Sequence, residues 1–255
     1  QNIKAQKKIM RYTFEKYAKP TYIIDRYIYT YPLHIAEKFE IPLIVYGENV
    51  SFVYGGEYAE ETYSARNQIL NGAASGISKA EIIQETGISE EDIVFFDPPE
   101  IKVLEELEPI YLSYFVFWNS YRHYNFAKSR GFHDLTHEWK RTHHIEDYDQ
   151  VDSRAYLVHS WLKYPKFGHA SATDYAARLI RYGLISREEG IRLVKEHDHK
   201  LDPLALSDFC NFLGYRESEF WKVVDRFYDP NLFYKNEFGE WKLRNPIWEQ
   251  ENITL

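Results

Sequence analysis

The fold of this chain depends on residues 41–49, which read Ile-Pro-Leu-Ile-Val-Tyr-Gly-Glu-Asn. The apolar run 41–46 is rich in β-branched residues and follows a helical pattern, which is typical of a buried strand in an α/β sheet. Ligands of open α/β sheets bind at the carboxyl ends of the strands. We therefore predict that Gly47, Glu48 and Asn49 edge a ligand pocket, although an ordinary strand-to-turn exit has the same pattern.

A second apolar run, Ile110–Trp118, predicts a second buried strand. Polar residues that follow it, Arg122 among them, begin a helix that we expect to end near Gly131. This alternation of helix and strand favours a parallel sheet and an α/β fold over residues 1–135. The free N–H groups at such a helix start attract anions, and an arginine binds phosphate or carboxylate through two bonds.

A third stretch, residues 166–174, places small residues before a helix predicted over Thr173–Tyr182. Ser171 or Thr173 can cap that helix. With Lys166 nearby, the helix start is a second candidate anion site. An ordinary capped helix explains the same pattern equally well.

The C-terminal half, residues 136–255, has a helical rhythm throughout. Ser186 begins a capping box for a helix over 187–197, and Pro203 begins a helix over 203–213 that Gly214 ends. Further upstream, Ile77–Val94 contains two short capped helices that resemble a helix-turn-helix.

The charge of the chain is −8 and is unevenly distributed. Residues 1–40 carry eight Lys and Arg against four Asp and Glu, whereas residues 47–108 carry three against fourteen. The second helix of the pair over Ile77–Val94 begins with three carboxylates, which would repel DNA. We therefore predict no nucleic-acid partner.

Cys210 is the only cysteine, which excludes a disulfide framework and a multi-cysteine metal site. No signal peptide or long apolar span is present, so we expect a cytoplasmic protein without a membrane span. Six histidines within residues 133–170 raise the alternative of a metal-dependent hydrolase. The stretch contains no HExxH pair, and we predict no metal site. Asp149 and Asp152 are instead candidate pocket acids.

The ordered series of motifs resembles the N-acetyl sugar amidotransferases of bacterial surface-glycan pathways, a branch of the PP-loop ATP pyrophosphatases. The resemblance runs from about Ile24 to Trp248. It is carried by Ile-Pro-Leu-Ile with Gly-Glu-Asn at 41–49, Phe-Trp-Asn-Ser-Tyr at 117–121 with Ala-Lys-Ser-Arg-Gly-Phe at 127–132, Lys-Phe-Gly and Ala-Thr-Asp within 166–174, Ser-Arg-Glu-Glu-Gly at 186–190, Phe-Trp-Lys-Val-Val-Asp at 220–225 and Asn-Pro-Ile-Trp at 245–248.

The resemblance implies an enzyme that uses ATP, with Mg²⁺, to convert an acetamido sugar into an acetamidino sugar for lipopolysaccharide or flagellin glycans. Ammonia would come from a glutaminase subunit through a cyclase-like subunit. The implied fold is a PP-loop α/β core followed by a helical region. Roles carried over by position are nucleotide binding by Gly47, Glu48 and Asn49, and substrate or phosphate binding by Trp118, Arg122, Asp152, Lys166, Gly168, Thr173 and Asp174.

The phosphate-binding loop of that superfamily, Ser-Gly-Gly-x-Asp-Ser, does not occur in the sequence. The chain also begins without Met, within a helical pattern. We expect the loop to lie upstream and the 255-residue chain alone to be inactive. The alternative is a non-catalytic binding or scaffold module of such a complex.

Overall fold

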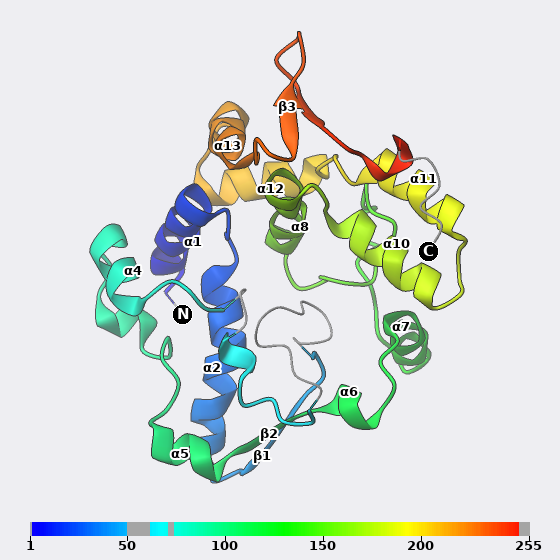
Figure 1. Ribbon diagram of the computed structural model, residues 1–255. Coiled ribbons are helices and arrows are strands. Elements are labelled where there is room, and N and C mark those ends of the chain that lie inside the picture. Colours follow the sequence, from blue (N-terminus) through cyan, green and yellow to red (C-terminus); the bar gives the residue numbers. More distant parts are fainter. Residues whose placement is uncertain (1, 50–61, 71–73, 250–255) are drawn as a thin grey trace. The chain divides into compact units, whose positions relative to one another are not determined.

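The computed structural model describes residues 2–49, 62–70 and 74–249, and the chain divides into two compact units, Gln1–Ser120 and Tyr121–Leu255 (Figure 1). We refer to these as the N-terminal and C-terminal units and describe each by itself. No helix in the described ranges is both long and apolar enough to cross a membrane.

The N-terminal unit consists of helices and a small two-stranded sheet. Asn2 caps the first of them, because its side-chain oxygen accepts from the N–H of Lys4 at 3.0 Å. The second helix continues through Pro32 and buries one face that includes Tyr22 and Leu33. The elements are α1 Ile3–Tyr17, α2 Tyr22–Lys38, η1 Gln68–Leu70, α4 Lys79–Thr86, η2 Glu90–Ile93, α5 Ile101–Glu106 and α6 Leu112–Phe115.

Two parallel strands, β1 Leu43–Tyr46 and β2 Glu108–Tyr111, form the sheet, with Leu43 opposite Glu108 and Tyr46 opposite Tyr111. This parallel pairing confirms the predicted α/β class. The two described strands do not amount to the full PP-loop core that we also expected. Ile44 packs against α2 and Leu107, but Leu43 and Val45 are each 51% exposed. The predicted buried strand is therefore only half-buried: side chains alternate, and the described elements cover one face.

The predicted strand Ile110–Trp118 is also wrong in its extent. Pairing with β1 ends at Tyr111, and the chain then turns into α6, whose Phe115 is exposed. A continuous apolar run fits a strand or a helix equally well until a partner strand selects between them. The predicted helix that follows is confirmed as α7 Ser120–Ser129.

The predicted helix pair over Ile77–Val94 is half right. Ser78 caps α4 through a 3.1 Å bond from the N–H of Glu81, and Gly87 ends it in a left-handed conformation. The second element, η2, is a short 3₁₀ turn, closed by a 3.2 Å bond from the Ser89 N–H to Asp92. A turn of this length lacks the recognition helix of a helix-turn-helix.

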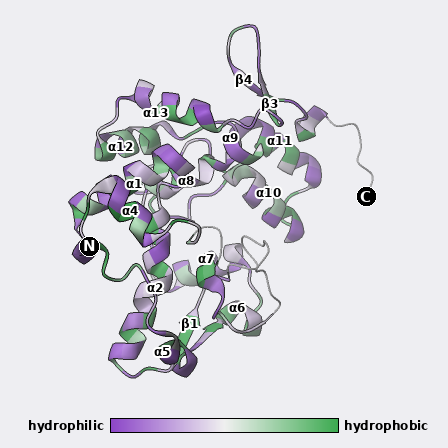
Figure 2. Ribbon diagram, turned by 60° about the vertical axis from the view of Figure 1, so that its left-hand side comes forward, coloured by the Kyte–Doolittle hydropathy of each residue, from purple (hydrophilic) through white to green (hydrophobic). Residues whose placement is uncertain are grey.

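The C-terminal unit is mainly helical and ends in a hairpin. The predicted helices over 187–197 and 203–213 are confirmed with their caps Ser186 and Gly214. Figure 2 shows the hydrophobic residues of the second of these helices, among which Phe209 packs edge-on against Phe220 at 5.8 Å. The elements after α7 are α8 Ala155–Trp161, α9 Lys163–Phe167, α10 Ser171–Arg181, α11 Arg187–His197, α12 Pro203–Leu213, α13 Glu217–Val224, η3 Asp225–Phe227, β3 Phe233–Lys235, β4 Trp241–Leu243 and η4 Ile247–Glu249.

Candidate functional site

The first two turns of α10 carry the candidate site in the C-terminal unit. The turn from α9 into α10 contains Gly168 with φ of 77°, a left-handed conformation. A Cβ there would lie 3.1 Å from Leu243 Cδ1, so glycine suits both the backbone and the space. The turn places Lys166, Thr173 and Asp174, which the sequence predicted as ligand contacts, in one short segment of chain.

The N-terminus of α10 is capped from within the chain. Asp198, which is buried at the end of α11, accepts from the N–H of Ala170 at 2.9 Å and of Thr173 at 3.0 Å. The Thr173 hydroxyl donates to the same carboxylate at 2.7 Å. Burial raises the pKa of Asp198, and these donors oppose that shift. The groups that we predicted would face a bound anion thus bind a carboxylate of the protein itself.

Asp174 is the centre of a charged cluster on α10. It pairs with Lys163 of α9, and its other carboxylate oxygen lies 3.9 Å from Nδ1 of His169. That nitrogen is buried and has no hydrogen-bond partner in the described ranges. The His169 ring stacks on the exposed ring of Phe167. Lys166 Nζ lies 5.4 Å from the centre of the Phe167 ring.

One turn further along α10, Arg178 adds a second ion pair. Its Nη1 lies 3.7 Å from Oδ2 of Asp149, and the Tyr175 hydroxyl donates to that same oxygen. Asp174 and Arg178 are four residues apart and therefore lie on the same side of the helix. The site consequently presents alternating cations and carboxylates, an arrangement that can both donate to and accept from a polyhydroxylated ligand.

A buried ion pair holds Asp149 in place. Arg141 Nη1 lies 3.1 Å from Glu146, and their side chains are only 2% and 3% exposed. Glu146 also accepts from the N–H groups of Tyr148 at 2.9 Å and Asp149 at 2.7 Å. Burial raises the pKa of Glu146 to about 7, against the opposing effect of Arg141. Perturbed carboxyls of this kind concentrate at functional sites.

A further contact holds the loop between α7 and α8, which contains Glu146 and Asp149, against α7. Tyr148 stacks on Tyr124 with ring centres 4.5 Å apart, and the Tyr124 hydroxyl donates to buried Asp134 at 2.6 Å. Hydrogen bonds from Thr136 and Tyr124 hold the pKa of Asp134 well below its usual range. The loop between α7 and α8 is thus fixed by carboxylates at both ends, although it contains no regular element.

The sequence predictions missed the residues that pair with the predicted ones or support them: Arg141, Glu146, Lys163, His169, Arg178 and Asp198. For Arg141 and Glu146 the available signal was the charge-rich string at 140–149, in which basic residues are followed by acidic ones. Of the two predicted pocket acids, Asp149 reaches α10, whereas Asp152 is exposed before α8.

The other predicted residues lie elsewhere. Gly47, Glu48 and Asn49 follow β1 in the N-terminal unit, and Trp118 lies half-buried before α7. Arg122 is exposed on α7. No group of three or more His, Cys, Asp or Glu within the described ranges is arranged to hold a metal ion.

A comparison with protein families matches residues 111–247 to the C-terminal domain of WbpG-like LPS biosynthesis proteins. The chain belongs to this family. The matched region contains α7 to α13 and therefore the whole α10 site. The family gives the protein a role in the biosynthesis of lipopolysaccharide or related surface glycans. No curated protein matches the sequence.

Proposed function

We propose that this protein is an ATP-dependent amidotransferase that converts an N-acetyl sugar into an acetamidino sugar for surface-glycan biosynthesis, and that the α10 site binds the sugar. The observation that carries the proposal is the position of this charged site inside the region matched to a lipopolysaccharide biosynthesis family. The ordered motifs that resemble sugar amidotransferases support the same reaction class.

The donor and acceptor types at α10 suit a sugar nucleotide or a sugar acid. Asp174 and Asp149 are acceptors for sugar hydroxyls, while Lys163 and Arg178 are donors for phosphate or carboxylate. The exposed ring of Phe167 offers an apolar surface for the C–H face of a sugar ring.

ATP would turn the amide oxygen into a leaving group with release of pyrophosphate, and ammonia would then replace it with release of AMP. Gly47, Glu48 and Asn49 fit only part of this nucleotide. They supply a carboxylate and an amide for hydroxyl or amino groups but no cation for a triphosphate. An added Cβ at Gly47 would have no atom within 4 Å, so the backbone is open to close approach. A glutaminase subunit and a cyclase-like subunit are the proposed ammonia source.

The test is AMP release by the full-length protein incubated with ATP, Mg²⁺, ammonium and UDP-linked N-acetyl sugars. We expect AMP only when the sugar is present. Asp174→Asn and Lys163→Ala should lower kcat/KM by about 10²-fold, chiefly through KM. Matched substitutions Glu237→Gln on the hairpin and Lys195→Ala on α11 should leave it unchanged.

Two results would contradict this proposal. If neither Asp174→Asn nor Lys163→Ala affects sugar-dependent AMP release, the sugar does not bind at α10. No AMP with any N-acetyl sugar would favour the non-catalytic binding module instead. We further expect that the 255-residue chain assayed alone releases no AMP.

A further inference from the structure

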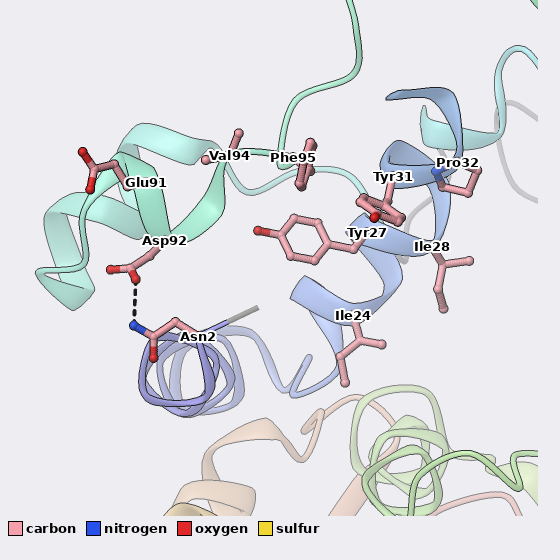
Figure 3. Close-up of a pocket in the computed structure, with 10 residues that line it drawn as sticks. All are labelled: Asn2, Ile24, Tyr27, Ile28, Tyr31, Pro32, Glu91, Asp92, Val94 and Phe95. Atoms are coloured by element: carbon pink, nitrogen blue, oxygen red, sulfur yellow. Dashed lines mark hydrogen bonds between the residues drawn. The ribbon is translucent and has the colours of Figure 1, made fainter. Parts of the chain in front are cut away.

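A cavity in the N-terminal unit lies between α2 and η2 (Figure 3). Its volume is about 850 Å³. One wall is a stripe of α2, and the opposite wall is the segment that leaves η2. Its lining includes Ile24, Tyr27, Ile28 and Tyr31 on α2 and Glu91 and Asp92 on η2. None of them belongs to the sites described above.

The stripe on α2 has the spacing of a helix that packs on a second partner. Ile24, Tyr27, Ile28 and Tyr31 follow one another at i, i+3, i+4 and i+7, which places them on one face. A different face of α2 already packs inward through residues such as Tyr29. Figure 3 shows Ile24 and Ile28 projecting from the same side of the helix. Ile28 is 43% exposed and Tyr31 is 46% exposed, so the described residues leave part of this second apolar face accessible.

The opposite wall is fixed rather than adaptable. Three consecutive carbonyls of the segment after η2 bind α2: that of Phe95 accepts from Thr30 at 2.6 Å, that of Phe96 from Arg26 at 2.7 Å, and that of Asp97 lies 2.8 Å from His34 Nε2. The Phe95 ring also packs edge-on against Tyr31 at 5.0 Å. A groove with both walls tied together is formed before any partner binds, which lowers the entropy lost on binding.

One end of the groove is acidic. Glu91 and Asp92 lie there, and the Tyr27 hydroxyl points toward that end (Figure 3). Asn2 donates to Asp92 at 2.9 Å and holds the pKa of this carboxyl below its usual value, while Lys8 also faces it. Desolvation raises the pKa of Tyr27 to about 12, so this hydroxyl remains a donor. The surrounding segment 81–108 carries ten Asp and Glu against one Lys or Arg.

We propose that this groove docks an amphipathic helix of a partner protein, with its apolar face on α2 and a Lys or Arg at the end that meets Glu91 and Asp92. Two observations select this occupant. The two carboxylates at one end of the groove, Glu91 and Asp92, favour a basic partner. The open walls leave half of Tyr31 and Val94 in solvent, whereas small-molecule sites bury most of their ligand. Apolar anchors at i, i+3, i+4 and i+7 are the mode by which helices bind grooves.

The probe is a stapled, fluorescent peptide of about 18 residues with leucines on one face and three lysines at one end. Its binding to the full chain is measured by fluorescence anisotropy beside a matched peptide in which glutamates replace the lysines. We expect the basic peptide to bind at least about tenfold more tightly than the acidic one, and to weaken as salt is raised.

Ile28→Asp and Glu91→Lys should each lower the affinity for the basic peptide by about tenfold or more. Phe238→Asp changes an apolar residue of the hairpin that is more exposed than Ile28, and Glu106→Lys makes the same change of net charge away from the groove. Neither control should alter binding. If circular dichroism shows that Ile28→Asp does not fold, Tyr31→Ala replaces it.

Three outcomes would overturn the proposal: equal binding of the two peptides, binding that survives the groove variants, and full displacement of the peptide by phenethylamine, which would identify a small-amine site. Self-association abolished by Ile28→Asp would reassign the groove to a second copy of the chain. The amidotransferase activity enters none of these measurements, so a failure here is distinguishable from a failure of the proposed reaction.

Discussion

The two units differ in what their most informative residues do. In the C-terminal unit, buried carboxylates such as Asp198 and Asp202 bind backbone N–H groups and hold irregular segments to helices. In the N-terminal unit, apolar residues such as Leu43 and Phe115 lie exposed on a two-stranded parallel sheet and the helix after it. The difference teaches that buried carboxylates satisfy backbone polar groups in the C-terminal unit, whereas the N-terminal unit presents apolar surface on which other groups can pack.

The sharpest way to break this comparison is to remove a carboxylate that organises the C-terminal unit. Asp202 is fully buried and accepts from the N–H groups of Thr142 at 2.7 Å, Leu204 at 2.8 Å and Ala205 at 3.0 Å. Asp202→Ala leaves these donors without a partner and removes the cap of α12. We expect a loss of about 3–5 kcal/mol in the free energy of unfolding, measured by urea titration.

The matched control is Asp208→Ala. Asp208 pairs with Arg154 on the surface of the same unit, and its removal should cost less than about 1 kcal/mol. Equal losses for the two variants would show that burial of the carboxylate does not matter, and the contrast between the units would then have no basis.

A smaller effect should follow from the pH dependence of Glu146. Its pKa in the folded chain, about 7, is higher than its ordinary 4.5, so between these values the folded state binds the proton more tightly than the unfolded state. The stability that this group contributes is therefore fully present below about pH 4.5 and is lost as the pH rises through 7. We expect a difference of about 1–3 kcal/mol in unfolding free energy across that window.

The measurement compares the native chain with Glu146→Gln by urea unfolding at several pH values. His144, whose pKa burial lowers to about 4, gives a slope of the opposite sign, so only the difference between the two proteins isolates Glu146. Parallel curves for the two proteins would mean that Glu146 keeps its ordinary pKa.

The smallest effect is expected on the exposed face of β1. Leu43 is half exposed, whereas its neighbour Ile44 packs against Leu33 and Leu107. Leu43→Ala should change the unfolding free energy by no more than about 0.5 kcal/mol, and Ile44→Ala should cost about 1–2 kcal/mol. Equal losses of unfolding free energy for the two variants would show that both faces of β1 are covered. The N-terminal unit would then not present the exposed apolar surface that distinguishes it from the C-terminal unit.

Sequence patterns predicted the C-terminal unit better than the N-terminal one. The helices over 187–197 and 203–213 were predictable because their signals are local: a capping serine, a proline at the first turn and a glycine at the end. The strand Ile110–Trp118 was not, because its length depends on β1, more than sixty residues upstream, whose pairing stops at Tyr111.

The candidate site was predicted only in part. Lys166, Gly168, Thr173 and Asp174 form one segment, and local sequence was enough to place them together. Their partners Lys163, Asp149 and Asp198 come from other elements, and only packing brings these to α10.

By itself the sequence determined where the helices over 187–197 and 203–213 begin and end, that Gly47, Glu48 and Asn49 follow the last residue of β1, and which segments resemble sugar amidotransferases. Those properties depend on residues near one another in the chain. The tertiary structure alone decided which charges meet. It placed the Asp198 carboxylate at the start of α10 and paired Arg141 with Glu146 in the interior. It also left Ile28 and Tyr31 of the α2 stripe partly exposed. Ion pairing and burial depend on distances in space, which periodicity along the chain does not encode.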